Sequence, residues 1–174
     1  MYETKIDGDV VVIGDVHGDY EQTKQLLGHL AVDKIIDDRW VVFLGDYVDC
    51  GPDTAKTIQL LLSFKKYHQN TTFLCGNHDL NLAKALGLVA CSKSDQAFYW
   101  NRIHQRNGAT LRSYGARDGV ELYKNMPDSH KEFLANLPWL VEHSDYLFVH
   151  AGFDPFESLQ LQIEKLDARD TNTH

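Results

Sequence analysis

The sequence predicts an α/β fold with a mainly parallel sheet. Four short runs of β-branched and aromatic residues recur along the chain, and helical patterns separate the first three of them. Continuous apolar runs of this length are typical of strands that are buried on both faces. The order strand, helix, strand, helix, strand favours right-handed crossovers between parallel strands.

The predicted strands and helices alternate in the first half of the chain. Strands are expected over residues 9–14, 40–45, 71–76 and 146–149, and helices over 20–31, 53–68 and 79–89. Within each predicted helix, apolar side chains recur at helical spacing, which would place them on one face. Asp53 follows Pro52 and is the expected N-cap of the second helix.

The second half of the chain is less regular. Residues 101–119 hold four arginines and three glycines, and we expect helix ends and loops above the sheet there. Pro127 opens a predicted short helix over 127–137, in which Phe133 and Leu134 belong to a buried stripe. Residues 158–170 are predicted to form a polar helical tail that leaves apolar side chains uncovered, which would favour self-association.

Composition limits the class of protein. The 174 residues suffice for one domain, which we place at 1–174, and 43% of them are hydrophobic. The net charge of -8 argues against nucleic-acid binding, which needs a basic surface. No apolar run approaches the roughly 20 residues of a membrane span, and residues 1–9 are too polar for a secretory signal. Three scattered cysteines do not make a disulfide framework, so we expect a cytoplasmic location and no membrane partner.

A polar cluster follows each predicted strand. Ligands of open α/β sheets bind at the carboxyl ends of the strands, so the four clusters are expected to meet at one place. The side chains brought together there would be Asp15, His17, Asp46, Asn77, His78 and His150, with Asp49 beside them. One Gly-Asp pair after a strand is most often a turn, but four clusters of metal-ligand type favour a site. The remaining histidines have no such context, and we interpret them as surface or helix-face residues: His29, His68, His104, His130 and His143.

The residue types in these clusters indicate metal chemistry. Crowded carboxylates repel one another unless a positive charge lies between them. A mixture of aspartate, histidine and asparagine suits manganese, iron or zinc better than calcium, which prefers oxygen alone. The set is too large for one ion and sufficient for two that share a carboxylate. Two cations roughly 3.5–4 Å apart serve the hydrolysis of phosphate esters.

Three of the clusters also carry a family resemblance. The motifs GDVHG (14–18), GDYVDCG (45–51) and GNHD (76–79) resemble the signature motifs of calcineurin-like metallophosphoesterases. The branch looks like the bacterial and phage phosphoprotein phosphatases, with the symmetrical diadenosine tetraphosphatases close by. The likeness covers residues 10–155 and implies a sandwich of two sheets flanked by helices.

The resemblance implies a place for each metal ligand. Asp15 and His17 would bind the first of two divalent cations, Asn77 and His150 would bind the second, and Asp46 would bridge both. Manganese is the metal expected first, with iron or zinc as alternatives, because geometry and availability select the metal more than raw affinity does.

The resemblance also implies a proton donor. His78 would stand near the leaving-group oxygen as the general acid, and Asp49 would hydrogen-bond to it and favour its charged form. Asp79 is expected to cap the helix that follows rather than to bind metal.

Two features depart from the family pattern. Cys50 stands where the family has an arginine that clamps the substrate phosphate, and the loss of that contact would weaken binding by about 10- to 100-fold. An arginine from elsewhere could substitute: Arg102, Arg106, Arg112 or Arg117. The family also has a further metal-binding histidine on a later strand, and only His174, which we do not expect to be a ligand, remains here. The C-terminal part of the second sheet is therefore expected to be missing, in a fragment or a shortened relative.

The leading functional hypothesis is a dinuclear enzyme that hydrolyses phosphomonoesters, on phosphoserine or phosphothreonine proteins or on small phosphoesters. Symmetrical hydrolysis of dinucleoside polyphosphates is the alternative activity, because the motif GNHDLNL (76–82) fits that group as well. A degenerate, non-catalytic module that binds metal or phosphate is the third possibility, given Cys50. A cysteine-dependent phosphatase is excluded, since no cysteine is followed six positions later by arginine.

Overall fold

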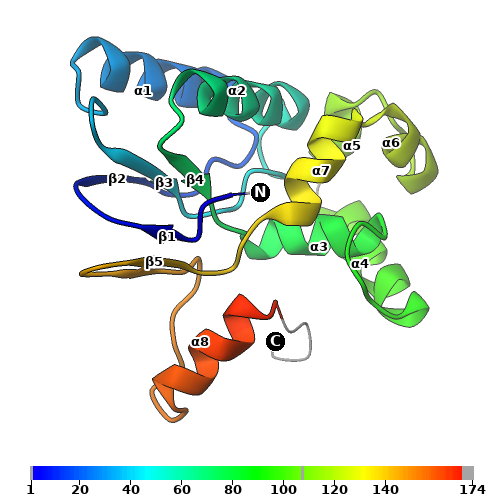
Figure 1. The fold of residues 1–174 in the computed structure, drawn as a ribbon. Helices are drawn as coiled ribbons and strands as arrows, with labels where there is room; N and C mark the ends of the chain where they lie inside the picture. The colour runs from blue at the N-terminus through cyan, green and yellow to red at the C-terminus, as the bar shows by residue number, and fades with distance from the viewer. Residues whose placement is uncertain (1, 107, 170–174) are drawn as a thin grey trace.

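Two small sheets and the helices around them form the fold (Figure 1). The computed structural model describes residues 2–106 and 108–169. The first sheet is parallel, in the order β2 (Val10–Ile13), β3 (Trp40–Phe43) and β4 (Thr71–Phe73). The second sheet has the order β1 (Lys5–Ile6), β5 (Val141–His143) and β6 (Leu147–Phe148). β5 pairs parallel with β1 and antiparallel with β6, and the predicted two-sheet α/β architecture is confirmed.

All four predicted strands are present, and two further strands were not predicted. The first three predicted strands are β2, β3 and β4. The fourth, predicted at 146–149, is β6, which lies in the second sheet and not beside the other three. β1 (KI) and β5 (VEH) were not predicted, because charged and polar side chains interrupt their apolar residues and leave no continuous apolar run.

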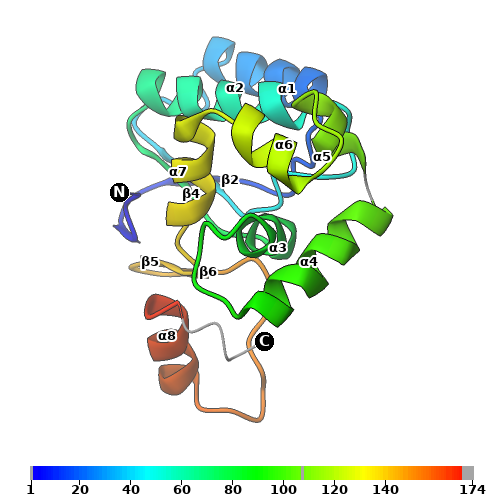
Figure 2. The ribbon, with the colours of Figure 1, turned by 90° about the vertical axis from the view of Figure 1, so that its right-hand side faces the viewer.

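Three helices follow the strands of the first sheet. They are α1 (Tyr20–Val32), α2 (Thr54–Tyr67) and α3 (Asn77–Ala85), and α1 and α2 lie together over one face of that sheet (Figure 2). The third helix starts two residues earlier and ends four residues earlier than predicted, and Gly87 beyond its end has a φ of +67°. Asp53 occupies the N-cap position of α2 but makes no capping hydrogen bond; its carboxylate pairs with Lys56 at 2.7 Å instead.

The region predicted as helix ends and loops, 101–119, is more helical than expected. It includes the end of α4 (Lys93–Arg106), all of α5 (Gly108–Ser113) and the start of α6 (Gly119–Asn125), and α7 (Asp128–Asn136) follows. Leu111 and Tyr114 from this region belong to the main core, and Tyr99 on α4 just before it packs against that core, so tertiary packing stabilises helices that the sequence pattern underestimates. No helix within the described ranges is long and apolar enough to cross a membrane.

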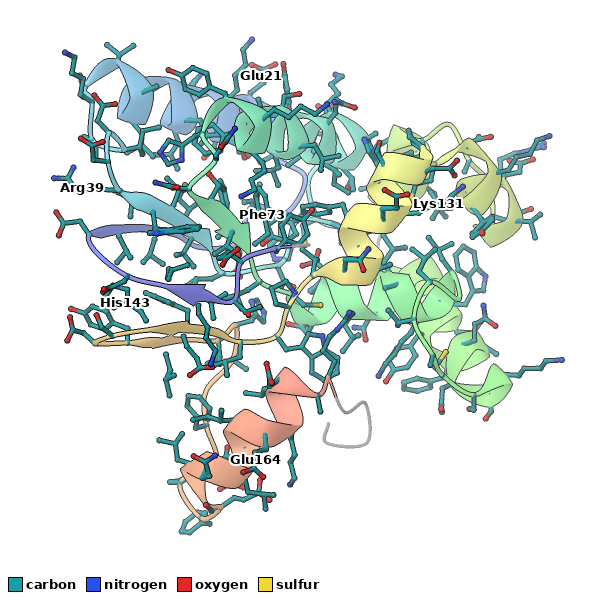
Figure 3. All side chains as sticks on the ribbon, viewed as in Figure 1. Glu21, Arg39, Phe73, Lys131, His143 and Glu164 are labelled. Atoms are coloured by element: carbon teal, nitrogen blue, oxygen red, sulfur yellow. The ribbon has the colours of Figure 1, made fainter. Side chains whose placement is uncertain are left out.

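The hydrophobic core has a larger and a smaller part. The larger part lies between the first sheet and the helices and includes Phe73, which is labelled in Figure 3. Phe73 stacks on Phe43 with ring centroids 5.0 Å apart. Tyr47 and Phe133 meet the Phe73 ring edge-on at 5.9 and 5.3 Å. The smaller part lies between the two sheets and consists of Ile6, Val42, Leu74 and Val141. Successive residues of β3 thus face opposite layers, as the pleat of a strand requires.

The C-terminal helix α8 (Leu159–Asp167) packs mainly through one end. Leu166 contacts the larger core, and Arg169 Nη2 donates a hydrogen bond to the carbonyl oxygen of Ala135 at 2.9 Å. Leu159 and Leu161 are 49% and 43% exposed, and Phe156, just before the predicted tail, is 97% exposed. Apolar side chains are therefore uncovered at the start of the tail, as predicted, while self-association stays a prediction.

His130 lies on the inner face of α7, so of the two interpretations, surface or helix-face residue, the structure contradicts the first. It is 2% exposed, and its Nδ1 lies 2.8 Å from Tyr114 Oη. Its Nε2 lies 3.4 Å from Gln59 Oε1. Burial lowers the pKa of His130, because desolvation disfavours the charged imidazolium.

We expect this buried histidine to make stability depend on pH. Unfolded His130 takes up a proton near pH 6.5, whereas the folded residue resists protonation. Its contribution to the free energy of unfolding is therefore present above pH 6.5 and is lost as the pH falls toward the folded pKa. Urea unfolding at pH 7 and pH 5 should show a smaller loss for His130→Gln than for the wild type. An equal loss in both proteins would contradict the assignment.

Candidate metal centre

The five predicted metal ligands lie together where β2, β3, β4 and β6 end. His17 Nε2 lies 3.9 Å from Asp15 Oδ2 and 3.7 Å from Asp46 Oδ2. His150 Nε2 lies 3.5 Å from the same Asp46 oxygen and 3.2 Å from Asn77 Oδ1. Four loops that are far apart in sequence therefore supply one cluster of oxygen and nitrogen ligands.

Asp46 is common to two groups of potential ligand atoms. One group combines Asp46 with His17 and His78, and the other combines it with Asp15 and His150; the atoms of each group lie within 4.8 Å of one another. The Asp46 residue is only 3% exposed. Two overlapping groups that share one carboxylate fit a pair of cations with a bridging aspartate.

Backbone contacts set the orientation of both candidate imidazole ligands. His17 Nδ1 lies 2.9 Å from the carbonyl oxygen of Val48, and His150 Nδ1 lies 2.9 Å from that of Leu44. A carbonyl oxygen can only accept, so Nδ1 carries the hydrogen in each ring. In the neutral ring, Nε2 then has a free lone pair, which is the form that binds metals.

The surroundings of His150 favour a positive charge at Nε2. The nearest polar atoms there are acceptors, the Asp46 carboxylate and the Asn77 amide oxygen. Without a metal, the hydrogen bond to Asp46 raises the pKa of His150 to about 9, so a proton supplies that charge. A cation at the same place would satisfy the same three atoms, which is the chemical behaviour expected of a metal site.

The loop after β3 has a strained backbone at the cluster. Asp46, Asp49 and Cys50 have φ angles of 55°, 66° and 60°, in the left-handed region that side chains other than glycine seldom adopt. Such strain gathers at functional sites, where the surrounding structure holds it. A Cβ atom added at Gly76 would overlap the Asp46 carboxylate, so glycine is required there for the loops after β3 and β4 to approach.

Asp79 connects these two loops. As predicted it caps α3, accepting from Gly76 N at 2.9 Å, but the same carboxylate also accepts from Asp46 N at 2.7 Å and Tyr47 N at 2.8 Å. The residue is fully buried. Burial raises the pKa of its carboxyl to about 7, while the three N–H donors act in the opposite direction. Asp79 therefore fixes the backbone of Asp46, the candidate shared ligand, and this contact was not predicted from the sequence.

His78 and Asp49 form the predicted pair. His78 Nδ1 lies 2.9 Å from Asp49 Oδ2, and the hydrogen bond raises the pKa of His78. The backbone N–H of His78 donates to Asp46 Oδ1 at 2.9 Å, so the pair is held against the ligand cluster.

Thr110 on α5 supports this pair and was not predicted from the sequence. Its hydroxyl donates to Asp49 Oδ1 at 2.8 Å and accepts from Asp49 N at 3.1 Å. Thr54 Oγ1, at the start of α2, lies 3.2 Å from the same hydroxyl, and both threonines are fully buried. Thr110 lies 61 residues from Asp49 in a segment predicted as loops, so no local pattern could have revealed the contact.

The structure places three of the residues that were considered for the phosphate-clamp position. The Cys50 side chain is exposed on the strained loop. Arg112 is exposed on α5, and Arg117 is engaged in an ion pair with Glu121. The side chains of Arg102 and Arg106, and the whole of His174, lie outside the described residues.

Comparisons with known proteins find similarity to a tetraphosphatase and to serine/threonine phosphatases. The chain is 28% identical over 145 residues to a symmetrical bis(5'-nucleosyl)-tetraphosphatase of Vibrio vulnificus, which covers 83% of this chain and 44% of that protein. It is 39% identical over 109 residues to a "probable serine/threonine-protein phosphatase" of Encephalitozoon cuniculi, which covers 61% of this chain and 23% of that protein. A serine/threonine phosphatase structure from Saccharomyces cerevisiae superposes with a TM-score of 0.52 at 19% identity, covering 91% of this chain and 45% of that one.

Each match covers a larger share of this chain than of the relative. The chain spans less than half the length of each of these relatives, so their whole activities do not transfer to it directly. A model of the calcineurin-like phosphoesterases, in contrast, matches residues 8–173. This chain therefore belongs to the calcineurin-like phosphoesterase family.

Proposed function

We propose that the chain hydrolyses phosphomonoesters at a centre of two divalent cations, with phosphoserine or phosphothreonine proteins as substrates. The observation that carries the proposal is the Asp46 Oδ2 atom, which lies 3.7 Å from His17 Nε2 and 3.5 Å from His150 Nε2. A carboxylate oxygen between two imidazole nitrogens suits a bridging ligand. A cytoplasmic location and a single domain over 1–174 belong to the same proposal.

In this proposal the ligands divide between two cations. Asp15 and His17 would hold the first, Asn77 and His150 the second, and Asp46 both, with manganese expected before iron or zinc. When bound, the cations would orient the phosphoryl oxygens and lower the pKa of a water molecule. The carbonyl oxygens of Val48 and Leu44 keep the two imidazoles in the ligating tautomer.

His78 supplies the proton in this proposal. Its Nδ1 is occupied by Asp49, so Nε2 is the atom that would protonate the leaving-group oxygen. Asp49 keeps the ring oriented, and its negative charge favours the protonated form before transfer. Thr110 holds the second oxygen of Asp49, so the carboxylate cannot rotate away from His78 without breaking that bond.

Symmetrical hydrolysis of dinucleoside polyphosphates is the second candidate. The similarity to the Vibrio vulnificus tetraphosphatase, which spans 83% of this chain, favours it. The cluster recognises phosphate rather than the remainder of a substrate, so rates on diadenosine tetraphosphate and a phosphopeptide must be compared side by side.

The test is hydrolysis of a generic aryl phosphate by protein loaded with manganese, nickel, iron or zinc. Activity that a chelator abolishes and metal restores would support the proposal. Inactivity with all four metals would refute it. Calorimetry should find two tight metal sites per chain, with one or both lost in Asp46→Asn. A single weak site would favour the non-catalytic module.

Cys50 offers a gain-of-function prediction. Cys50→Arg should lower KM for a phosphorylated substrate by about 10- to 100-fold, because a guanidinium can form a charge-assisted bidentate bond with phosphate. Cys50→Gln is the matched control, since it adds length without charge and should leave KM nearly unchanged. An unchanged KM in Cys50→Arg would mean that this position does not face the bound phosphate.

A further inference from the structure

We propose that Lys84 and Tyr99 form a second anion subsite, which binds a phosphate group of the substrate beyond the one that is cleaved. This inference rests on the dinuclear centre of the proposed function, which it extends, and it concerns the second candidate substrate class, the dinucleoside polyphosphates, because a phosphoserine or phosphothreonine carries no second phosphate. A pocket of about 680 Å³ adjoins the metal centre, and its lining includes Asn77, His150, Lys84, Tyr99 and Trp139. The pocket therefore connects two candidate metal ligands with a lysine deeper along α3.

Helix α3 forms one wall of this pocket. Asn77, Leu80, Asn81 and Lys84 all line it, and this spacing of three, four and seven residues marks one face of a helix. A rise of about 1.5 Å per residue places Lys84 about 10 Å along the axis from Asn77. A ligand that spans the pocket can therefore place one phosphoryl group at the metal centre and a second anionic group near Lys84.

The Lys84 ammonium group is buried without a matching negative charge among the described residues. Lys84 is 4% exposed, and its Nζ lies 3.3 Å from Tyr99 Oη and 4.8 Å from the centre of the Tyr99 ring. No carboxylate within residues 2–106 and 108–169 forms an ion pair with it. An ammonium group has three donors, and a buried unpaired charge is costly, so an anion at the pocket would compensate Lys84.

The other charged residues of the pocket come from the α8 side. Lys165 lines the pocket too, but its Nζ lies 2.6 Å from Glu157 Oε1, so these two charges offset one another. The Asp154 carboxylate accepts from Phe156 N in its own loop, at 2.8 Å. Lys165 therefore provides a matched control: a lysine in the same pocket that already has a carboxylate partner.

The ligand class follows from the charge and the spacing. The backbones of Asn77 and Lys84 are about 10 Å apart along α3, so a ligand that reaches both places needs anionic groups that are separated along its length. A linear oligophosphate, either free or within a larger ester, has anionic oxygens at both ends and can satisfy both places. The aromatic walls formed by Tyr99 and Trp139 leave room for an apolar or aromatic part of such a ligand.

Calorimetric titration of the metal-free chain with inorganic tripolyphosphate tests the subsite without relying on hydrolysis. Lys84→Met should weaken binding by about 10-fold or more, because a charge-assisted bond is lost. Lys165→Met should change the dissociation constant by less than about twofold. Equal affinity of Lys84→Met and the wild type, or no binding by the wild type at millimolar ligand, would overturn the inference.

Two further measurements keep the result interpretable. Thermal unfolding confirms that each variant is folded, and Lys84→Gln replaces Lys84→Met if the latter is not. Lys84→Arg, which keeps the charge, should restore most of the affinity. Failure of aryl phosphate hydrolysis would refute the proposed function alone, whereas failure of the titration would refute the subsite alone.

Discussion

Replacing His78 by asparagine is expected to lower kcat by about 100- to 10,000-fold, the range that general acid catalysis contributes. His78 Nδ1 is bound to Asp49 at 2.9 Å, so the ring presents Nε2 for proton transfer. The loss should be larger for a phosphoserine peptide than for a nitrophenyl phosphate, because an alkoxide leaving group needs a proton far more than a stabilised phenolate does. Steady-state kinetics on both substrates measures the difference.

The metal content of the His78→Asn variant distinguishes between two roles for His78, proton donor and metal ligand. Its ring also lies within reach of the ligand atoms of His17 and Asp46, so a role as a metal ligand is geometrically open. If His78 donates a proton, His78→Asn keeps two metals per chain by calorimetry. Loss of one metal together with an equal loss of activity on both substrates would show that His78 is a ligand instead.

Thr110→Val should lower kcat less than His78→Asn does, since it leaves His78 and Asp49 in place. The variant removes the hydroxyl that donates to Asp49 Oδ1 at 2.8 Å and keeps nearly the same volume. We expect kcat to fall about 10- to 100-fold, as is usual when the partner of a catalytic or ligating group is removed. A merely structural threonine would lower the unfolding midpoint without changing kcat of the folded fraction.

The sequence is sufficient to predict the cluster because its residues belong to local motifs at strand ends. Each motif follows an apolar run, and the carboxyl ends of parallel strands meet at one edge. His150 follows β6 of the second sheet, yet its Nε2 still lies 3.5 Å from Asp46 Oδ2. The predicted ligand His150 reaches the cluster from the second sheet because the two sheets pack face to face through residues such as Val42 and Val141.

The supporting residues could not be predicted in the same way. Thr110 depends on packing between α5 and the loop after β3, which are 61 residues apart. Lys84 sits in an ordinary amphipathic helix, and only its burial beside Tyr99 sets it apart. Asp79 was correctly predicted as a cap, but its two further hydrogen bonds depend on the loop after β3 approaching closely. Long-range contacts of this kind leave no periodicity in the sequence.

Replacing Asp79 is expected to have the largest effect on stability. Its carboxylate accepts from the backbone N–H groups of Asp46, Tyr47 and Gly76 in a fully buried position. Each buried donor left without a partner costs about 1–3 kcal/mol, so Asp79→Ala should lose about 3 kcal/mol or more in hydrogen bonds, of which the removal of a buried charge offsets a part. Total stabilities are about 5–15 kcal/mol, so this variant is close to the limit of folding.

Asp79→Asn makes the effect measurable. The amide retains one acceptor oxygen but turns an NH₂ group toward at least one backbone N–H, so we expect a loss of about 1–3 kcal/mol in urea unfolding of the metal-free protein. Asp19→Asn is the matched control: it caps α1 through Gln22 N at 3.1 Å, and asparagine caps a helix about as well as aspartate. Metal affinity should fall only in the Asp79 variant, because Asp79 holds the backbone of the shared ligand Asp46. If both variants unfold at the same urea concentration, Asp79 is an ordinary helix cap and Asp46 is positioned by other contacts.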